Sequence, residues 1–163
     1  MKTDQYYINE LRRQLEKGNI QKGYKILLDY VLSLKNHLQD KYPEYSIPNS
    51  IYHGYLDMTY FPIFPKSLKN VGLKIALVFN YEEFRFEIWL SANNKKVQKE
   101  YWEIIKERKL DKYKIVASVQ GNDSIIEKYI DNDINLDNQR ALTETIEKEI
   151  IEFIKDIEEI LKL

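Results

Sequence analysis

The chain contains no cysteine among its 163 residues, and this absence excludes several classes of protein at once. Without a thiol there is no disulfide scaffold, no cysteine nucleophile, no cysteine-ligated zinc and no iron–sulfur site. Histidine is also scarce, because only His37 and His53 are present, which leaves little for a histidine-rich metal centre. The sequence therefore predicts a protein of a reducing compartment that carries no metal or other cofactor.

Glycine is scarce too, and none of the five glycines belongs to a phosphate-binding motif. A Walker loop and the pattern GxGxxG are both absent, as are the catalytic motifs GxSxG and HExxH. Residues 131–135 are similar to the start of a calcium loop, but Leu136 and Leu142 occupy the positions that need glycine and glutamate. We therefore interpret this segment as a helix connection rich in capping residues.

Long apolar runs are missing as well. The N-terminus lacks the apolar stretch of a signal peptide, and no segment approaches the roughly 18 apolar residues that a transmembrane helix needs. Hydrophobic residues make up 44% of the chain and charged residues 31%, which is ordinary for one globular domain. We expect a cytoplasmic protein that forms a single domain over residues 1–163 and has no membrane partner.

The net charge of −1 conceals an uneven distribution along the chain. Residues 1–110 are mildly basic, whereas residues 111–163 carry 13 acidic and 7 basic side chains. A strong nucleic-acid binder would show a basic domain or stripe, and this distribution shows neither, so we expect no strong nucleic-acid partner. Apolar residues recur at regular spacing through the acidic end, so we interpret that end as the solvated face of a helix.

Hydrophobic periodicity divides the chain into helices and strands. Apolar residues at three- and four-residue intervals predict helices over residues 4–17, 20–39, 94–107 and 138–161, and a serine–glutamate pair predicts a short helix from Ser124. Alternating apolar residues predict strands over residues 51–61, 73–79, 84–90 and 113–119. Pro62 and Pro65 are expected to end the first strand, because proline cannot donate to a ladder.

This order of elements predicts an α+β domain. We expect a mostly antiparallel sheet of about four strands, with an N-terminal helical hairpin and C-terminal helices packed on it. The central hairpin supplies eight alternating apolar side chains, which we expect to form the core face. They are Leu73, Ile75, Leu77, Phe79, Phe84, Phe86, Ile88 and Leu90.

The opposite face of these strands carries the candidate site. Arg85, Glu87 and Trp89 alternate on one strand and Lys74 lies on its neighbour. If the register of the first strand brings Asp57 and Tyr55 alongside, charged and aromatic groups converge on one surface. Paired carboxylates beside a cation could bind a metal, or their pKa values could separate so that one acts as an acid and the other as a base. A charge-balanced structural network of Asp57, Arg85 and Glu87 is the competing interpretation.

A nuclease-like pattern is the second interpretation of the same residues. Restriction-type nucleases place an aspartate on one strand and Glu-x-Lys on the next, where the lysine assists a metal-bound water. Asp57 and Glu87 fit the two metal ligands, but Trp89 occupies the lysine position, and Lys74 would have to substitute from a neighbouring strand. On this hypothesis the protein is a metal-dependent hydrolase.

Thirteen tyrosines are many for this length, and five of them crowd, together with two phenylalanines, into the stretch before the central hairpin. The crowded positions are Tyr42, Tyr45, Tyr52, Tyr55, Tyr60, Phe61 and Phe64. Such a cluster could stack on bases or an aromatic ligand, or it could pack at the sheet margins with its hydroxyls in water. His53 is a candidate general base, or a structural residue beside Gly54.

Two central segments resemble a family of uncharacterised bacterial proteins. They are HGYLDMTYF at residues 53–61, and LKIALVFN at residues 73–80 followed by RFEIWL at residues 85–90. The resemblance implies a soluble bacterial domain and assigns no role to any residue.

We therefore expect a non-catalytic domain that binds a small ligand or a protein partner through its mixed aromatic and charged sheet face. The candidate residues are His53, Tyr55, Asp57, Lys74, Arg85, Glu87 and Trp89. A metal-dependent hydrolase using Asp57 and Glu87 is the alternative, so the sequence leaves enzyme status open. A homodimer built from the long amphipathic helices is a third expectation.

Overall fold

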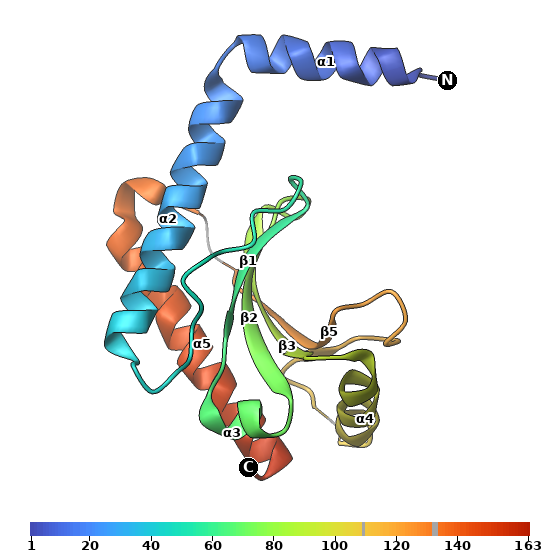
Figure 1. Cartoon of the computed structure of the whole chain (residues 1–163), viewed down its shortest axis with the longest axis vertical. Coiled ribbons are helices and arrows are strands. Elements are labelled where there is room, and N and C mark those ends of the chain that lie inside the picture. The colour runs from blue at the N-terminus through green and yellow to red at the C-terminus, as the bar shows by residue number, and fades with distance from the viewer. Residues whose placement is uncertain (109, 132–133) are drawn as a thin grey trace.

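A computed structural model describes residues 1–108, 110–131 and 134–163 of the chain (Figure 1). Asn132 and Asp133, inside the calcium-loop-like segment, lie outside the described residues. The elements, in chain order, are α1 (Asp4–Glu16), α2 (Asn19–Lys41), β1 (Met58–Ile63), α3 (Lys66–Asn70), β2 (Leu73–Asn80), β3 (Arg85–Ala92), α4 (Lys95–Lys106), β4 (Lys114–Ile115), β5 (Ser124–Tyr129), the short 3-10 helix η1 (Leu136–Asn138) and α5 (Gln139–Leu161). This order confirms the predicted α+β class.

The strands form one antiparallel sheet in the order β1-β2-β3-β5-β4. Because side chains alternate along each strand, the register places two sets of residues on opposite faces. One set is apolar and almost fully buried on β2 and β3. The other set holds Lys74, Ala76 and Val78 of β2 opposite Ser91, Trp89 and Glu87 of β3.

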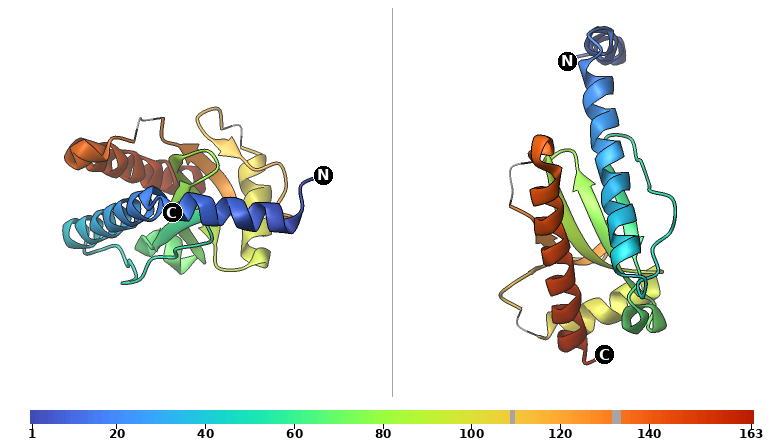
Figure 2. Two further views of the ribbon diagram at one scale, coloured as in Figure 1. Left: turned by 90° about the horizontal axis from the view of Figure 1, so that it is seen from above. Right: turned by 90° about the vertical axis from the view of Figure 1, so that its left-hand side faces the viewer.

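Helices α2 and α5 lie side by side and cover the apolar face of the sheet (Figures 1 and 2). Each helix presents a stripe at three- and four-residue spacing, as the sequence predicts. The stripe of α2 consists of Leu27, Val31, Leu34 and Leu38, and that of α5 of Leu142, Ile146, Ile150, Phe153 and Ile157. These side chains are at most 6% exposed, so both helices are held to the sheet by apolar burial.

A polar cluster joins α2 to α5 at the margin of this core. Glu147 of α5 accepts a hydrogen bond from the hydroxyl of Tyr42 at 2.6 Å and pairs with Lys41 Nζ at 2.5 Å and His37 Nε2 at 2.6 Å. Burial raises the pKa of Glu147, but the hydrogen bonds from Lys41, Tyr42 and His37 outweigh burial and lower it to about 2. The carboxylate is therefore part of the helix–helix packing.

The edge strand β1 explains how Pro62 fits inside a strand, although the sequence predicts that it ends one. The N–H groups of Tyr60 and Phe64 point away from the sheet, to the carbonyls of Tyr52 and Ser46 at 3.0 Å each. Pro62 lies midway between them and so has its missing N–H on the same outer side. No ladder hydrogen bond is lost, which is the condition under which proline is tolerated in an edge strand.

In the last third, one predicted element is wrong and another is longer than the observed one. Residues 124–129 form β5 and not a helix, because Ile125 and Ile126 are fully buried and the segment pairs with β3. Tertiary pairing here overrides the capping signal, and Ser124 instead donates to Glu127 within the strand at 2.7 Å. The strand predicted over residues 113–119 is shortened to Lys114–Ile115, which forms β4.

The β2–β3 turn and the segment before β1 also differ from prediction. Phe84 is expected in the core, but it lies in the turn with a φ of 50° and is 64% exposed. Strand β1 begins at Met58, so residues 51–57 are not the first half of a strand. Gly54 and Leu56 have φ angles of 73° and 63°, and these left-handed residues turn the chain into a loop.

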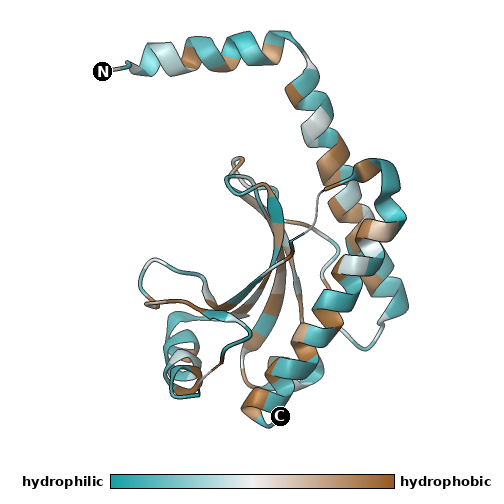
Figure 3. Cartoon of the chain, turned by 180° about the vertical axis from the view of Figure 1, so that it is seen from behind, coloured by the Kyte–Doolittle hydropathy of each residue, from teal (hydrophilic) through white to brown (hydrophobic). Residues whose placement is uncertain are grey.

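The two N-terminal helices form a pair with a sharp corner, and α1 does not fold back along α2 (Figure 2). Helix α1 has no buried residue. Figure 3 shows hydrophobic residues along α1 and the start of α2, although α1 stands clear of the sheet. None of the helices in the described residues is both long enough and apolar enough to cross a membrane.

Candidate functional site

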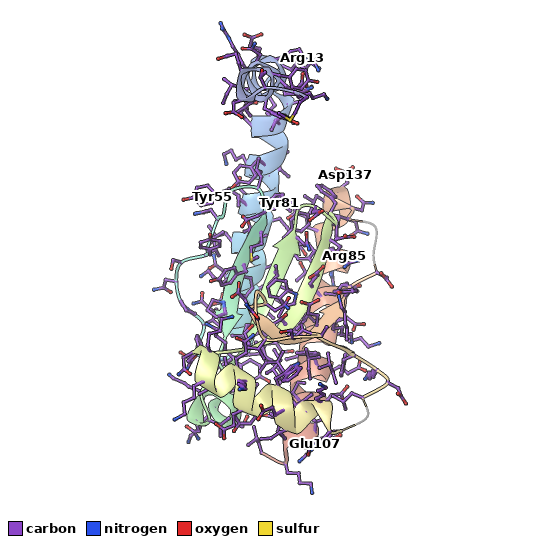
Figure 4. The ribbon with its side chains drawn as sticks, turned by 90° about the vertical axis from the view of Figure 1, so that its right-hand side faces the viewer. Arg13, Tyr55, Tyr81, Arg85, Glu107 and Asp137 are labelled. Carbon is purple, nitrogen blue, oxygen red and sulfur yellow. The ribbon has the colours of Figure 1, made fainter. Side chains whose placement is uncertain are left out.

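The face of the sheet opposite α2 and α5, which is turned toward the viewer in Figure 4, carries a hollow of about 320 Å³. We call it the open-face hollow. Ala76 and Val78 form its floor, and Tyr60 of β1 and Trp89 of β3 stand on either side. Residues at the start of α4 line one end. The small side chains of β2 leave room between two larger rings, which gives a volume at the lower end of ligand pockets.

Trp89 is held in place by a buried carboxylate. Its indole Nε1–H donates to Glu87 Oε2 at 2.8 Å. Glu87 is 2% exposed, and its other oxygen accepts from Arg85 Nε at 2.9 Å and from Asn80 Nδ2 at 3.3 Å. The three donors engage both carboxylate oxygens of Glu87. The carboxylate therefore holds the indole of Trp89 in place as one wall of the hollow.

A second layer of contacts fixes Arg85. Its guanidinium lies 3.7 Å from the centroid of the Tyr129 ring, a cation–π geometry. Burial lowers the pKa of Arg85, but the hydrogen bond and charge of Glu87 outweigh burial and raise it above its usual value. The hydroxyl of Tyr129 donates to Glu127 at 2.8 Å and accepts from Lys114 Nζ at 2.7 Å. This half of the open face is a balanced network, so its residues serve to position Trp89.

Lys74 differs from the other charged residues of the open face. It lines the hollow and is half-buried. Arg85 and Glu87 satisfy one another, but the side chain of Lys74 makes no ion pair or hydrogen bond to any residue that the structure describes. A half-buried cation without a partner favours an anion from outside, because a charge-assisted hydrogen bond would offset its lost hydration.

The end of the hollow at α4 is polar and rigid. Asn94 caps α4 by accepting from Val97 N–H at 3.0 Å. Gln98 is 3% exposed and donates to the carbonyls of Asn122 and Ser124, which fixes the segment before β5 against the helix. Lys95 donates to the carbonyl of Asn122 at 2.6 Å. The start of a helix favours negative charge, so this end adds to the attraction of Lys74 for an anion.

Three sequence-predicted site residues lie elsewhere, in the loop before β1. Tyr55 is 92% exposed at the loop tip (Figure 4). Asp57 Oδ1 accepts from Tyr55 N–H at 2.8 Å, and hydrogen bonds from the backbone of Tyr55 and Met58 hold the pKa of Asp57 below its usual value. His53 is exposed, and its carbonyl accepts from the hydroxyl of Thr59 at 2.7 Å. These residues shape the loop and do not reach the hollow.

The predicted pairing of Asp57 with Glu87 is therefore wrong, for a reason of register. Asp57 lies in the loop before β1, and the strand residues that continue its alternation, Thr59 and Phe61, face the core, so Asp57 is not on the open face. Glu87 is already engaged by three donors. Among the described residues no three histidine, aspartate or glutamate side chains are grouped to hold a metal ion.

The tyrosine-rich stretch forms separate pairs. The rings of Tyr42 and Tyr45 stack at 5.6 Å between centroids, and those of Tyr52 and Tyr60 lie 5.0 Å apart along the edge of β1. Of these four residues, Tyr60 lines the hollow. The stretch thus wraps the sheet margin, with one ring turned to the candidate site.

Several residues of the site escape the sequence analysis. Glu127 and Tyr129 are missed because their strand is predicted as a helix. The adjacent β-branched residues Ile125 and Ile126 are the signal that could have found this strand. Asn94 and Gln98 are missed because nothing in their spacing indicates that α4 meets the open face.

Fold and site together define an α+β domain in which helices cover one face of an antiparallel sheet and the other face holds a polar-ended hollow. The chain belongs to a family described as a domain of unknown function, DUF7000, whose family model matches residues 4–161. This match confirms the resemblance to an uncharacterised family. Comparisons with curated proteins and with solved structures gave no match.

Proposed function

We propose that this domain binds a small anionic molecule with a flat ring in the open-face hollow, and that it does so without catalysis. The observation that carries the proposal is Lys74, a half-buried cation unpaired among the described residues, beside two aromatic walls. Tyr60 and Trp89 offer their rings to a flat group above Ala76 and Val78. Lys74 and the start of α4 attract the anionic group.

The arrangement of the carboxylates favours binding over hydrolysis. Glu87 is occupied by Arg85, Trp89 and Asn80, so it is not free to act as a general base. The other carboxylate beside the hollow, Asp123, is exposed and lies 3.7 Å from Lys95 Nζ. A nucleophile or base within hydrogen-bond reach of a substrate is what catalysis would require. The hollow offers aromatic, amide and cationic groups, which suit recognition.

Replacing Lys74 with Ala is expected to weaken binding of such ligands about 10–100-fold, the value of one charge-assisted hydrogen bond. The measurement is isothermal titration with a panel of aromatic carboxylates and nucleoside monophosphates. Lys99→Ala is the matched control, since Lys99 is exposed on α4 and does not line the hollow. A panel in which no member binds, or in which Lys74→Ala binds as tightly as the parent protein, would contradict the proposal.

A further inference from the structure

A second surface, remote from the open-face hollow, remains unexplained. A groove of about 430 Å³ lies between the first turns of α2, the β2–β3 turn and η1. We call it the hairpin-tip groove. Its lining is almost wholly apolar and includes Ile20, Gly23, Tyr24, Leu56, Phe84 and Leu136. An apolar groove with exposed walls is typical of a surface that binds a helix.

Two residues that line this groove have a strained backbone. The described part of the chain has three non-glycine residues at positive φ, and two of them, Leu56 and Phe84, line this groove. They are 52% and 64% exposed. A bulky apolar residue in the left-handed region is unfavourable, and its exposure to water is unfavourable as well. Both costs are offset if another apolar surface covers these side chains.

Helix α1 of the same chain carries an exposed apolar stripe on one side. Its stripe of Tyr7, Ile8, Leu11 and Leu15 is 60%, 59%, 52% and 37% exposed. These residues recur at three- and four-residue spacing on one side of the helix, which is the pattern of a helix that docks in an apolar groove. The described residues of the chain bury none of this stripe.

The corner between α1 and α2 keeps this helix out of its own groove. Gly18 adopts a φ of 74° and caps the start of α2. The side chain of Gln21 donates to the carbonyl of Leu15 at 2.8 Å, and Gly18 N–H donates to the same carbonyl at 3.0 Å. With the corner closed in this way, α1 extends away from α2 as a free arm (Figures 1 and 2).

We infer that the hairpin-tip groove receives α1 of a second copy of this chain, in a two-fold dimer that exchanges its arms reciprocally. One chain carries both the apolar helix and the groove, so a single symmetric contact satisfies both copies. Arg12 borders the apolar stripe of α1 but is paired with Glu16 of the same helix at 3.1 Å, so we expect the contact to be apolar and not ionic.

Gly23 gives the groove its depth. It lies inside α2, near the start of the helix, where glycine is unfavourable relative to alanine. A Cβ placed there would meet no atom within 4 Å, so the space above it is open. An incoming helix can therefore approach closely at this point. The same openness means that a large side chain at this position would fill the groove and leave the fold of the protomer intact.

Sedimentation equilibrium of the full chain tests the inference. We expect a species of twice the 19.6 kDa chain mass, and a dissociation constant weakened about 30-fold or more by either Leu11→Glu or Gly23→Trp. Asn9→Glu is the matched control, because it adds the same charge on the opposite side of α1. A parent protein that stays monomeric at all concentrations, or a dimer that neither variant weakens, overturns the inference.

Cysteine cross-linking separates exchange between copies from closure within one chain. Since the chain has no cysteine, two introduced ones report a single contact. A mixture of Leu11→Cys protein with Gly23→Cys protein is expected to form a covalent heterodimer under mild oxidation. If the Leu11→Cys, Gly23→Cys double variant instead forms only an internal disulfide as a monomer, α1 closes on its own groove and the proposed exchange is wrong.

Discussion

The variant Glu87→Gln is expected to lower the free energy of unfolding by about 2–4 kcal/mol. Glutamine keeps the shape of the side chain but replaces one acceptor oxygen with a donor. Either Arg85 or the indole N–H of Trp89 then faces an amide nitrogen, and Arg85 loses its charged partner in a setting where Glu87 is 2% exposed. Chemical denaturation monitored by circular dichroism measures the change.

Glu83→Gln is the matched control for this experiment. Its carboxylate lies 3.7 Å from Arg85 Nη1, but the side chain is 54% exposed. We expect a loss of less than about 0.5 kcal/mol, as for other solvent-exposed ion pairs. If Glu87→Gln were as stable as the parent protein, Glu87 would be a charge kept at a cost to folding, and it would have to be counted as a ligand contact.

Stability is expected to fall in acid because of Glu147, the carboxylate between α2 and α5. The folded state holds its pKa at about 2, below the ordinary value of 4.5. A group with a lowered folded pKa contributes its stability above the unfolded pKa and loses it as the pH falls toward the folded pKa. We therefore expect Glu147 to contribute about 2–3 kcal/mol at pH 7 and less than half of that near pH 3.

The difference in unfolding free energy between the parent protein and Glu147→Gln, measured at pH 7 and pH 3, isolates this contribution. Glu144→Gln is the matched control, because Glu144 is 64% exposed on the same helix and pairs with the exposed Arg140. A difference that stays constant between the two pH values would show that the carboxylate of Glu147 has an ordinary pKa in the folded state.

The helices and the central hairpin could be predicted because their signals are local. The stripe of α2 from Leu27 to Leu38 and that of α5 repeat with the helical period, and both helices begin and end within a few residues of their predicted bounds. The register of β2 with β3 follows from alternation and a short turn, so Lys74, Arg85, Glu87 and Trp89 fall on one face as expected.

The rest of the site depends on contacts between segments distant in sequence. Nothing local shows that β5 pairs with β3, so the capping pattern at Ser124 prevails in a sequence prediction and conceals Tyr129. Asp57 is misplaced for a related reason, because the left-handed backbone at Leu56 ends the alternation just before β1 begins. Left-handed leucine and phenylalanine are rare enough that no composition rule anticipates them.

The open-face hollow as a ligand site is tested most directly by nuclear magnetic resonance of the ¹⁵N-labelled protein. The chain has two tryptophans, and their indole N–H signals separate the hollow, at Trp89, from the second half of α4, where Trp102 does not line the hollow and donates to the carbonyl of Val116. On titration with a ring-bearing anion from the panel, we predict shifts at the indole of Trp89 and the backbone of Ala76, Val78 and Ser91, with Trp102 unchanged. Shifts confined to the hairpin-tip groove, at Tyr24 and Phe84, would contradict the account.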